Sequence, residues 1–203
     1  MIVRQFLQWI RYAPPGHRAE ATSALARAYL HSDLSADDLA AAEGAMIMLL
    51  DDPSPLVRRA LAEVFACSQK APGVIVQALA ADQPDVAIPV LSRSPLLTED
   101  DLVDLIATGQ PDAQVAIASR VLLPRSLAAA IAEVGRAEAC LALLENPDAE
   151  IALFSIDRMV AIRTTNLART PGFPPSGMCW GRWRRQRKSA ASCSSGTTAG
   201  FRA

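Results

Sequence analysis

A polar residue followed by proline recurs four times along this 203-residue chain, each time ahead of a segment with helical apolar spacing. The prolines are Pro53, Pro84, Pro111 and Pro147, separated by 31, 27 and 36 residues. A proline in the first turn of a helix loses nothing by lacking an N–H, and the polar side chain before it can cap that turn. We therefore predict that each proline marks a helix start and that the β-branched residue four positions later faces the core. These residues are Val57, Ile88, Val115 and Ile151.

The apolar residues favour helices over strands. After Pro53, the residues Val57, Ala60, Leu61, Val64 and Phe65 follow the i, i+3, i+4, i+7, i+8 spacing of one helix face. Alternation of apolar and polar residues never lasts long enough to indicate a sheet. Because aromatic residues make up only 5% of the chain, the core must consist mainly of aliphatic side chains and alanine. The chain is predicted to be all-α.

A second repeated segment defines the repeating unit. The segment Ser92-Arg93-Ser94-Pro95-Leu96-Leu97 recurs 27 residues later as Ser119-Arg120-Val121-Leu122-Leu123, and each is followed by a predicted helix, over 98–108 and roughly 125–134. Thr98 with Asp101 resembles a capping box, and Gly109 and Gly135 stand where glycine ends a helix. The unit is therefore a helix–turn–helix hairpin, and hairpins must stack because none can bury its apolar stripe alone.

Three further helices are predicted before the repeats, over residues 2–12, about 17–31 and about 35–50. Pro14-Pro15-Gly16 separates the first two, and Ser35 with Asp38 opens the third. We interpret residues 1–50 as an N-terminal cap, 51–168 as the repeats, and 1–168 as one helical domain. Residues 169–203 form a separate basic tail.

Several of these motifs resemble known families. Asp52-Pro53-x-x-x-Val57-Arg58 resembles the first helix of HEAT repeats, while Pro89–Leu102 and Leu143–Ile151 resemble an uncharacterised alphaproteobacterial family, domain of unknown function 2336. The resemblance covers roughly residues 20–165 and ends after about Ile162. It implies a HEAT-like α-solenoid of stacked hairpins in the bacterial cytoplasm, and it brings no known activity or catalytic residue.

Charge divides the chain into two parts. Residues 1–170, called the body below, hold 14 basic and all 21 acidic residues, a net charge of −7, whereas 171–203 hold six basic residues and no acid. The run Trp180–Lys188 combines two tryptophans with five basic residues, a composition able to bind RNA, DNA or an anionic membrane. Two other interpretations of this tail remain open: an unstructured extension and a shifted reading frame.

Catalytic, metal and cofactor motifs are not evident. His17 and His31 have no partners at the spacing of a triad or a metal site, and we expect them at the surface or near helix ends. Cys67 and Cys140 are expected to be small core residues, and Cys179 and Cys193 incidental. The acids Glu99, Asp100, Asp101 and Asp104 suit the first turns of a helix. No apolar run reaches the ~18 residues of a membrane span, and no secretory signal is visible, so cytoplasmic localisation is expected.

Arg93 and Arg120 are the candidate partner-binding residues, since the repeated segments that begin at Ser92 and Ser119 place them in the same register of successive hairpins. Their guanidinium groups could face an acidic partner. Alternatively, each caps its own helix end or pairs with an acid of the neighbouring hairpin, among Asp100 to Asp104. Arg58 and Arg59 are expected to form similar contacts between repeats.

The sequence thus predicts a non-enzymatic scaffold that binds a protein or peptide partner on one face of the solenoid, with no cofactor or small-molecule substrate. The alternatives are a nucleic-acid-binding HEAT-like protein, which a body charge of −7 disfavours, and an enzyme with an unrecognised site. Nucleic acid or anionic membrane could bind only through the tail. A homodimer could form through an exposed end of the repeats.

Overall fold

The computed structural model describes residues 2–108 and 110–169, and within them the chain is entirely helical. Eleven helices and no strand occur in these residues, which confirms the predicted all-α class. Residues 2–157 form one compact unit, and a second unit begins at Arg158. The helices are α1 Ile2–Ile10, α2 Pro15–His31, α3 Ala36–Leu49, α4 Pro55–Phe65, α5 Gly73–Ala80, α6 Pro84–Arg93, α7 Glu99–Thr108, α8 Pro111–Ala118, α9 Arg125–Val134, α10 Ala137–Glu145 and α11 Leu153–Arg169.

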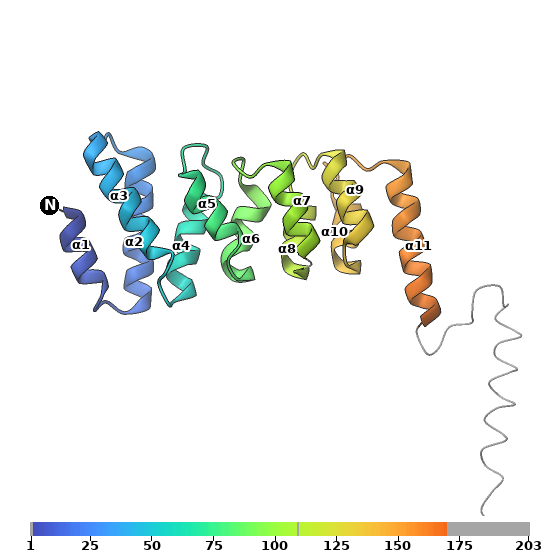
Figure 1. The fold of residues 1–203 in the computed structure, drawn as a ribbon, viewed down its shortest axis with the longest axis horizontal. Helices are drawn as coiled ribbons and strands as arrows, with labels where there is room; N and C mark the ends of the chain where they lie inside the picture. The colour runs from blue at the N-terminus through green and yellow to red at the C-terminus, as the bar shows by residue number, and fades with distance from the viewer. Residues whose placement is uncertain (1, 109, 170–203) are drawn as a thin grey trace, which may run out of the picture. The chain divides into compact units, whose positions relative to one another are not determined.

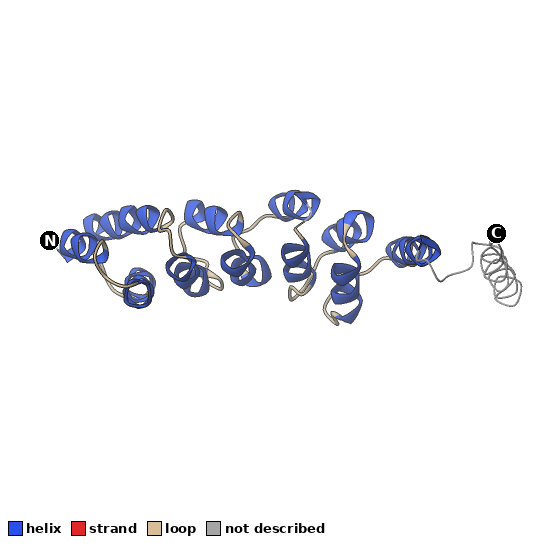
Figure 2. Ribbon diagram, turned by 90° about the horizontal axis from the view of Figure 1, so that it is seen from below, coloured by secondary structure: helices blue, strands red, loops and turns tan. Residues whose placement is uncertain are grey.

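The helices of the first unit lie in two layers (Figures 1 and 2). In one layer α2 packs on α4, α4 on α6, α6 on α8 and α8 on α10. In the other layer α1 packs on α3 and α7 on α9. Residues 1–50, predicted as a cap, lie in the same compact unit as the helices that follow, and α2 is the first member of the even-numbered layer.

Prolines begin four helices, though not all at the predicted positions. Pro84 and Pro111 start α6 and α8 as predicted, but α4 starts at Pro55 and α11 at Leu153. Pro53 cannot open α4 because Ser54, which precedes Pro55, is held extended at ψ 119°. Pro147 lies in a turn, so the prediction was wrong there too.

Aligning the helices on their first proline corrects the predicted core register. The buried position lies two residues after that proline: Val57 in α4, Val86 in α6 and Ala113 in α8. Ile88, four residues after Pro84, is 38% exposed, so its predicted burial was wrong. The predicted burial of Val57 was correct. Val57 lies four residues after Pro53 but also two residues after Pro55, the proline that opens α4.

Side chains cap some helices but not those that begin with proline. Ser35 accepts a hydrogen bond from the Asp38 N–H, and Thr98 accepts one from the Asp101 N–H, as predicted. In contrast, Gln83 and Gln110 make no side-chain capping bond. The predicted capping by the polar residue before each proline was therefore wrong for α6 and α8.

Small side chains allow the even-numbered helices to approach closely. Ala26 of α2 and Ala62 of α4 are completely buried, and the ring of Tyr29 meets Phe65 edge to face at 6.3 Å between ring centres. Cys140 is buried as expected, but Cys67 follows the end of α4 and is exposed, which corrects the prediction for that residue.

Glycine ends α9 for a steric reason. Gly135 is the C-terminal cap with φ −66°, outside the left-handed region. A Cβ at this position would lie 2.3 Å from the Ile131 carbonyl oxygen, which a side chain cannot tolerate. The predicted end of α9 is confirmed, and Gly109 lies outside the described residues.

Removing a buried hydroxyl from α2 should stabilise the protein. The Thr22 side chain is fully buried, and its Oγ1 has no hydrogen-bond partner within the described structure. Thr22→Val removes that desolvated group at nearly constant shape, so we expect the free energy of unfolding to rise by about 1 kcal/mol. Urea denaturation followed by circular dichroism measures the change.

The matched control is Thr98→Val, which removes a hydroxyl that caps α7. This variant should instead lower the stability, because the Asp101 N–H loses its acceptor. Destabilisation by both variants would mean that Thr22 has a role that its surroundings do not reveal.

Candidate functional site

Two arginines at equivalent positions join successive helices of the even-numbered layer. Arg18 and Arg58 each lie three residues after the proline that starts their helix. Arg18 donates from Nε and Nη2 to the two carboxylate oxygens of Asp52, at 2.9 and 2.8 Å, in the loop before α4. Arg58 donates in the same way to Asp82, before α6. Each arginine therefore holds the start of the next helix in its layer.

The two pairs form one continuous chain of contacts. Arg58 also donates to the backbone carbonyl of Asp52, and Asp52 accepts from the Ser54 N–H. Asp82 similarly accepts from the Gln83 N–H. All four charged side chains are at most 18% exposed. Because each guanidinium is matched by a carboxylate, this chain holds the helices in register without leaving a net charge.

A glutamine takes the arginine's place in α8. Gln114, three residues after Pro111, donates to the Ile106 carbonyl at 2.8 Å and accepts from the Arg136 N–H at 3.0 Å. Arg136 precedes α10, so Gln114 again holds the start of the next helix in the layer. In α6 the same position is Ala87, which is too short to make this contact.

At the opposite ends of these helices, polar side chains bind carbonyl groups that a helix leaves without intrahelical partners. The Arg120 guanidinium, just after α8, donates to the carbonyls of Leu91 and Ser94 at the end of α6. The Asn146 amide, after α10, donates to the carbonyls of Ala118 and Arg120, both at 2.8 Å. We call these contacts, together with those of Arg18, Arg58 and Gln114, the pins.

The structure places Arg93 and Arg120 in different environments, although they lie in segments of similar sequence. Arg93 is the last residue of α6 and is exposed. Arg120 lies beyond the end of α8, is partly buried, and binds carbonyls of the neighbouring helix instead of the acids at 100–104. Burial lowers the pKa of Arg120 from its ordinary value. Both arginines lie nine residues after the proline that opens their helix, so they share the predicted register, but their surroundings differ.

The predicted role of Arg58 and Arg59 in contacts between repeats is confirmed for one residue only. Arg58 holds Asp82, as described above, whereas Arg59 pairs with Glu63 one turn later in its own helix at 2.9 Å. Both members of the second pair are about half exposed.

The turn between α8 and α9 exposes two apolar side chains, and one of the two residues has a strained backbone conformation. Leu122 has φ 54°, and no other non-glycine residue in the described part of the chain has a positive φ. Leu122 is 80% exposed and Val121 73%. The turn is fixed on both sides: Asn146 donates to the Arg120 carbonyl, and the Glu150 N–H donates to the carbonyl of the buried Leu123. Because the Leu122 side chain is exposed, its own burial does not offset the cost of this conformation.

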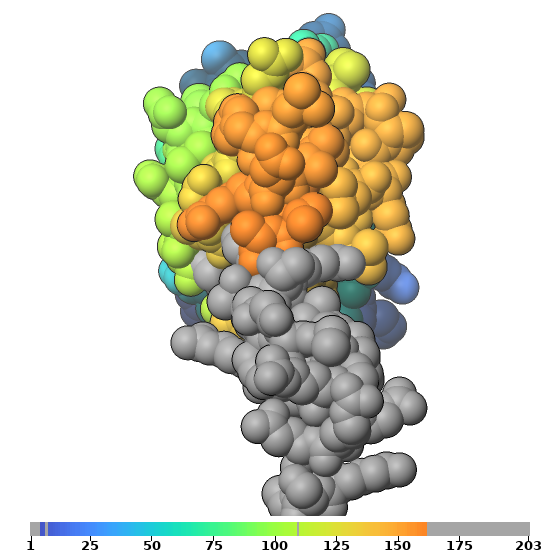
Figure 3. Space-filling model, turned by 90° about the vertical axis from the view of Figure 1, so that its right-hand side faces the viewer, coloured from blue at the N-terminus to red at the C-terminus, as the bar shows by residue number. Residues whose placement is uncertain are grey.

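The surface beside this turn is hollowed. Val121, Ala142 and Pro147 form the apolar wall of a hollow of about 300 Å³, and Glu145 and Asp148 supply its charge. Leu153 and Phe154, at the start of α11, are 82% and 57% exposed. Figure 3 faces the part of the molecule where α8 to α10, in green to yellow, and the start of α11, in orange, reach the surface.

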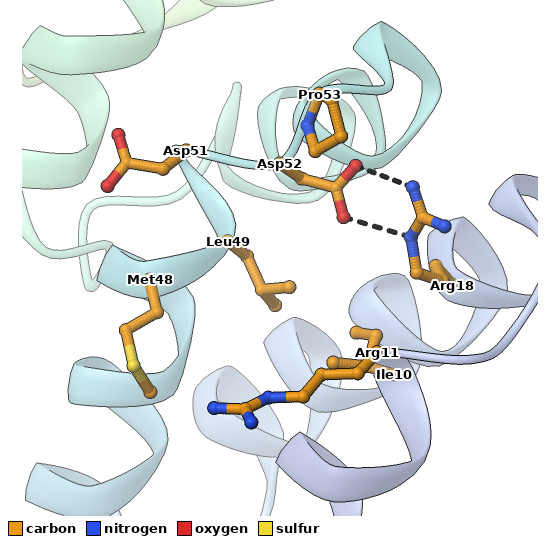
Figure 4. Close-up of a pocket in the computed structure, with 8 residues that line it drawn as sticks. All are labelled: Ile10, Arg11, Arg18, Met48, Leu49, Asp51, Asp52 and Pro53. Carbon is orange, nitrogen blue, oxygen red and sulfur yellow. Dashed lines mark hydrogen bonds and ion pairs between the residues drawn. The ribbon is translucent and has the colours of Figure 1, made fainter.

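A larger hollow of about 400 Å³ lies at the N-terminal end, bounded by α1, α2, α3 and the loop before α4. Ile10, Met48 and Leu49 line it together with four charged residues. In Figure 4 Arg18 and Asp52 face each other, whereas Arg11 and Asp51 point away from that pair. With two cations and two anions the hollow is electrically balanced, so it does not select a charged ligand.

The described residues were compared with the side-chain groupings that hold metal ions. No group of three or more His, Cys, Asp or Glu side chains lies close enough in that part of the chain to hold a metal ion. His17 and His31 are exposed, and Glu99, Asp100 and Asp101 occupy the first turn of α7 as predicted. A membrane-spanning helix is likewise absent from the described part, where every helix is too short or too polar. The tail, with Cys179 and Cys193, lies outside the described residues.

Adjacent arginines provide a test of the pins. Arg58→Met should lower the free energy of unfolding by about 2 kcal/mol, since it leaves the partly buried Asp82 without its cation. Arg59→Met should change stability by less than about 0.5 kcal/mol, because the pair that it breaks is exposed. Chemical denaturation of the two variants measures this difference, and equal effects would rule out a specific role for Arg58.

The Arg58–Asp82 pair should also make the free energy of unfolding depend on pH in the acidic range. Partial burial acts to raise the pKa of Asp82, but hydrogen bonds from Arg58 and the Gln83 N–H outweigh it and lower the pKa below its ordinary value of 3.8. A carboxyl whose pKa is lowered by folding stabilises the fold above its unfolded pKa, and this contribution disappears as the pH falls through the folded pKa. The stability difference between the wild type and Asp82→Asn should therefore be constant near neutrality and shrink below about pH 4. Denaturation curves from pH 7 to 2.5 would show it, and a constant difference over that range would contradict the prediction.

Comparison with known sequences gives one family. No curated protein and no solved structure matches the chain. Residues 86–165, which run from α6 into α11, match the family described as an uncharacterised protein conserved in bacteria, DUF2336. The match is shorter than the predicted range of about 20–165, and it includes Arg120, the strained Leu122 and Asn146. Over residues 86–165 the chain is therefore similar to this bacterial family, as the sequence motifs predicted.

Proposed function

We propose that this chain is a HEAT-like α-solenoid that acts as a non-enzymatic scaffold in the bacterial cytoplasm and binds a protein or peptide partner. The solenoid interpretation is supported by the even-numbered layer, in which each helix packs on the next and the pins recur at equivalent positions. Repeats of this kind are stabilised mainly by contacts between neighbours, and their exposed faces bind other macromolecules.

The Val121–Leu122 turn is the observation that carries the proposal of a partner. An apolar side chain in the left-handed region costs free energy, and exposing it to water brings no return within the isolated chain. Residues that persist in such a conformation are held there by their surroundings and are concentrated at functional sites. The carbonyl contacts on both sides of the turn hold Leu122 rigidly. A rigid exposed leucine beside a hollow has the features of an anchor for a partner.

The chemistry of the partner follows from what surrounds the turn. The hollow beside Val121 carries Glu145 and Asp148 and no basic residue on its wall. A segment with an apolar residue and adjacent lysines or arginines would complement it. Nucleic acid fits less well, because it needs clustered free cations, whereas Arg18, Arg58 and Arg120 are engaged in pins. Arg93, which is exposed, remains a candidate contact at a different part of the surface.

Replacing Leu122 by asparagine should separate stability from binding. Leu122→Asn removes the apolar side chain and places a residue that tolerates positive φ, so the free energy of unfolding should rise by about 1 kcal/mol. Loss of an anchoring side chain should at the same time weaken partner binding by about tenfold or more. The full chain and its variants would be used for affinity capture from bacterial lysate, and the captured partner would then be purified and its affinity measured by calorimetry.

Leu56→Asn is the matched control. Leu56 is 57% exposed at the start of α4, so the same change occurs on an ordinary helix surface. A partner that binds the wild type and Leu56→Asn equally but is lost with Leu122→Asn supports the proposal. Equal binding by all three proteins, or recovery of nucleic acid alone, would contradict it.

A further inference from the structure

The hollow beside the Val121–Leu122 turn presents hydrogen-bond acceptors, and the side-chain donors on its wall are already used. The Ser119 hydroxyl donates to the Val115 carbonyl at 2.9 Å. The Asn146 amide donates both of its protons to backbone carbonyls at and just beyond the end of α8. Among the described residues that line the hollow, no other side chain has a donor group. A ligand that fits the hollow must therefore bring the donors itself.

Two carboxylates on this wall remain available to such a ligand. Glu145 is the last residue of α10, Asp148 lies in the turn that follows, and both are exposed. Neither side chain forms an ion pair or a hydrogen bond with any residue that the structure describes. The guanidinium of Arg120 donates instead to carbonyls at the end of α6. The negative charge of the hollow is therefore unbalanced.

The ends of two helices add to this negative potential. Ser119 is the C-terminal cap of α8, and Asn146 is the C-terminal cap of α10. The C-terminal end of a helix carries a partial negative charge, because its last carbonyl groups have no intrahelical partners. A cation in the hollow would lie near both helix ends as well as both carboxylates.

The apolar part of the wall favours a guanidinium over an ammonium group. Val121, Ala142 and Pro147 supply this part. A guanidinium is planar and weakly hydrated, so its face can lie on apolar side chains while its edge donates N–H groups to carboxylates. An ammonium is compact and strongly hydrated, and it loses more hydration on entering such a hollow. The volume of about 300 Å³ is at the lower limit of small-molecule sites, which suits a single side chain.

We propose that this hollow binds an arginine side chain of the protein partner, with the guanidinium paired to Glu145 and Asp148. This inference rests on the proposed function, because it names the residue that the partner inserts beside Leu122. Val121 lines the hollow and Leu122 follows it in the chain, so an apolar residue next to that arginine would reach the exposed leucine. The partner is then recognised by an arginine and an apolar residue together.

Nuclear magnetic resonance with a minimal probe tests the hollow without the partner. The probe is N-acetyl-arginine amide, added to the isotope-labelled full chain. We expect binding in the millimolar range, as for other ligands of this size, with the largest shifts at the backbone amide signals of residues 142–148. N-acetyl-lysine amide has the same charge without the planar fork, and it should bind about fivefold more weakly.

Removing one carboxylate should weaken the arginine probe selectively. Asp148→Asn keeps the shape of the side chain and removes its charge, so binding of N-acetyl-arginine amide should fall about fivefold. The spectrum of the variant without the probe also shows whether it is folded.

The matched control is Asp104→Asn, the same change in a different hollow. This hollow, of about 250 Å³, lies between α5 and α7, where α5 presents the short side chains of Ala80 and Ala81. Its other acid, Asp101, already accepts hydrogen bonds from the Thr98 hydroxyl and N–H, so only Asp104 offers a carboxylate without a partner there. The control should leave binding of the probe at the end of α10 unchanged.

Three results would overturn the proposal: equal binding of the arginine and lysine probes, shifts beside Asp104 as large as those at the end of α10, or no shifts there at all. The captured partner separates this inference from the proposed function. A partner lost with Leu122→Asn but bound at full affinity by Asp148→Asn would keep the leucine anchor and refute the arginine site. The reverse pattern would support the arginine site and refute the anchor.

Discussion

The arrangement of this protein depends on how each helix of the even-numbered layer is fixed to the next one. Packing of alanine- and leucine-rich faces sets the register along such helices less sharply than directional hydrogen bonds and ion pairs do. The pins supply such directional contacts. Arg18 and Arg58 donate hydrogen bonds to carboxylates at the start of the following helix in this layer. Arg120 and Asn146 donate to carbonyls at the end of the preceding helix in this layer. Because both ends of the helices are held, their buried stripes meet at defined heights.

The pins also decide which charges remain for other contacts. Arginines that could have marked a site for phosphate are matched by Asp52 and Asp82 or by helix carbonyls. The acids on α7 and beside α10 have no such partners in the hollows they line. At the Val121–Leu122 turn the surface therefore favours a basic, partly apolar segment of a protein partner.

The proposed partner site lies where the local structure departs from regular helix packing, and so does the space between α5 and α7. At the turn after α8, contacts from Asn146 and Glu150 hold Leu122 in a conformation that an isolated turn would avoid. Between α5 and α7, a helix with short side chains leaves space that the layer does not fill. In each case contacts with neighbouring helices set the local geometry. As a result, a side chain such as that of Leu122 or Asp104 remains exposed to solvent.

The sequence by itself determined the helical class and most helix positions, because these follow from local propensities such as proline at a first turn and Thr98 or Ser35 as a cap. It misplaced the core register at Ile88, since Pro53 and Pro84 look alike locally but only Pro84 opens a helix. Two of the helices, α5 and α10, lacked a marking motif and were not singled out.

Only the tertiary structure distinguished Arg93 from Arg120 and Arg58 from Arg59. The members of each pair occupy similar sequence contexts, yet one arginine of each pair reaches a neighbouring helix and the other stays at the surface or within its own helix. Likewise, no local pattern marks Leu122 as strained or the space between α5 and α7 as open. Such features depend on which elements lie opposite one another, and that is decided by contacts between residues 20 to 35 positions apart, such as Arg18 with Asp52 and Arg120 with Ser94.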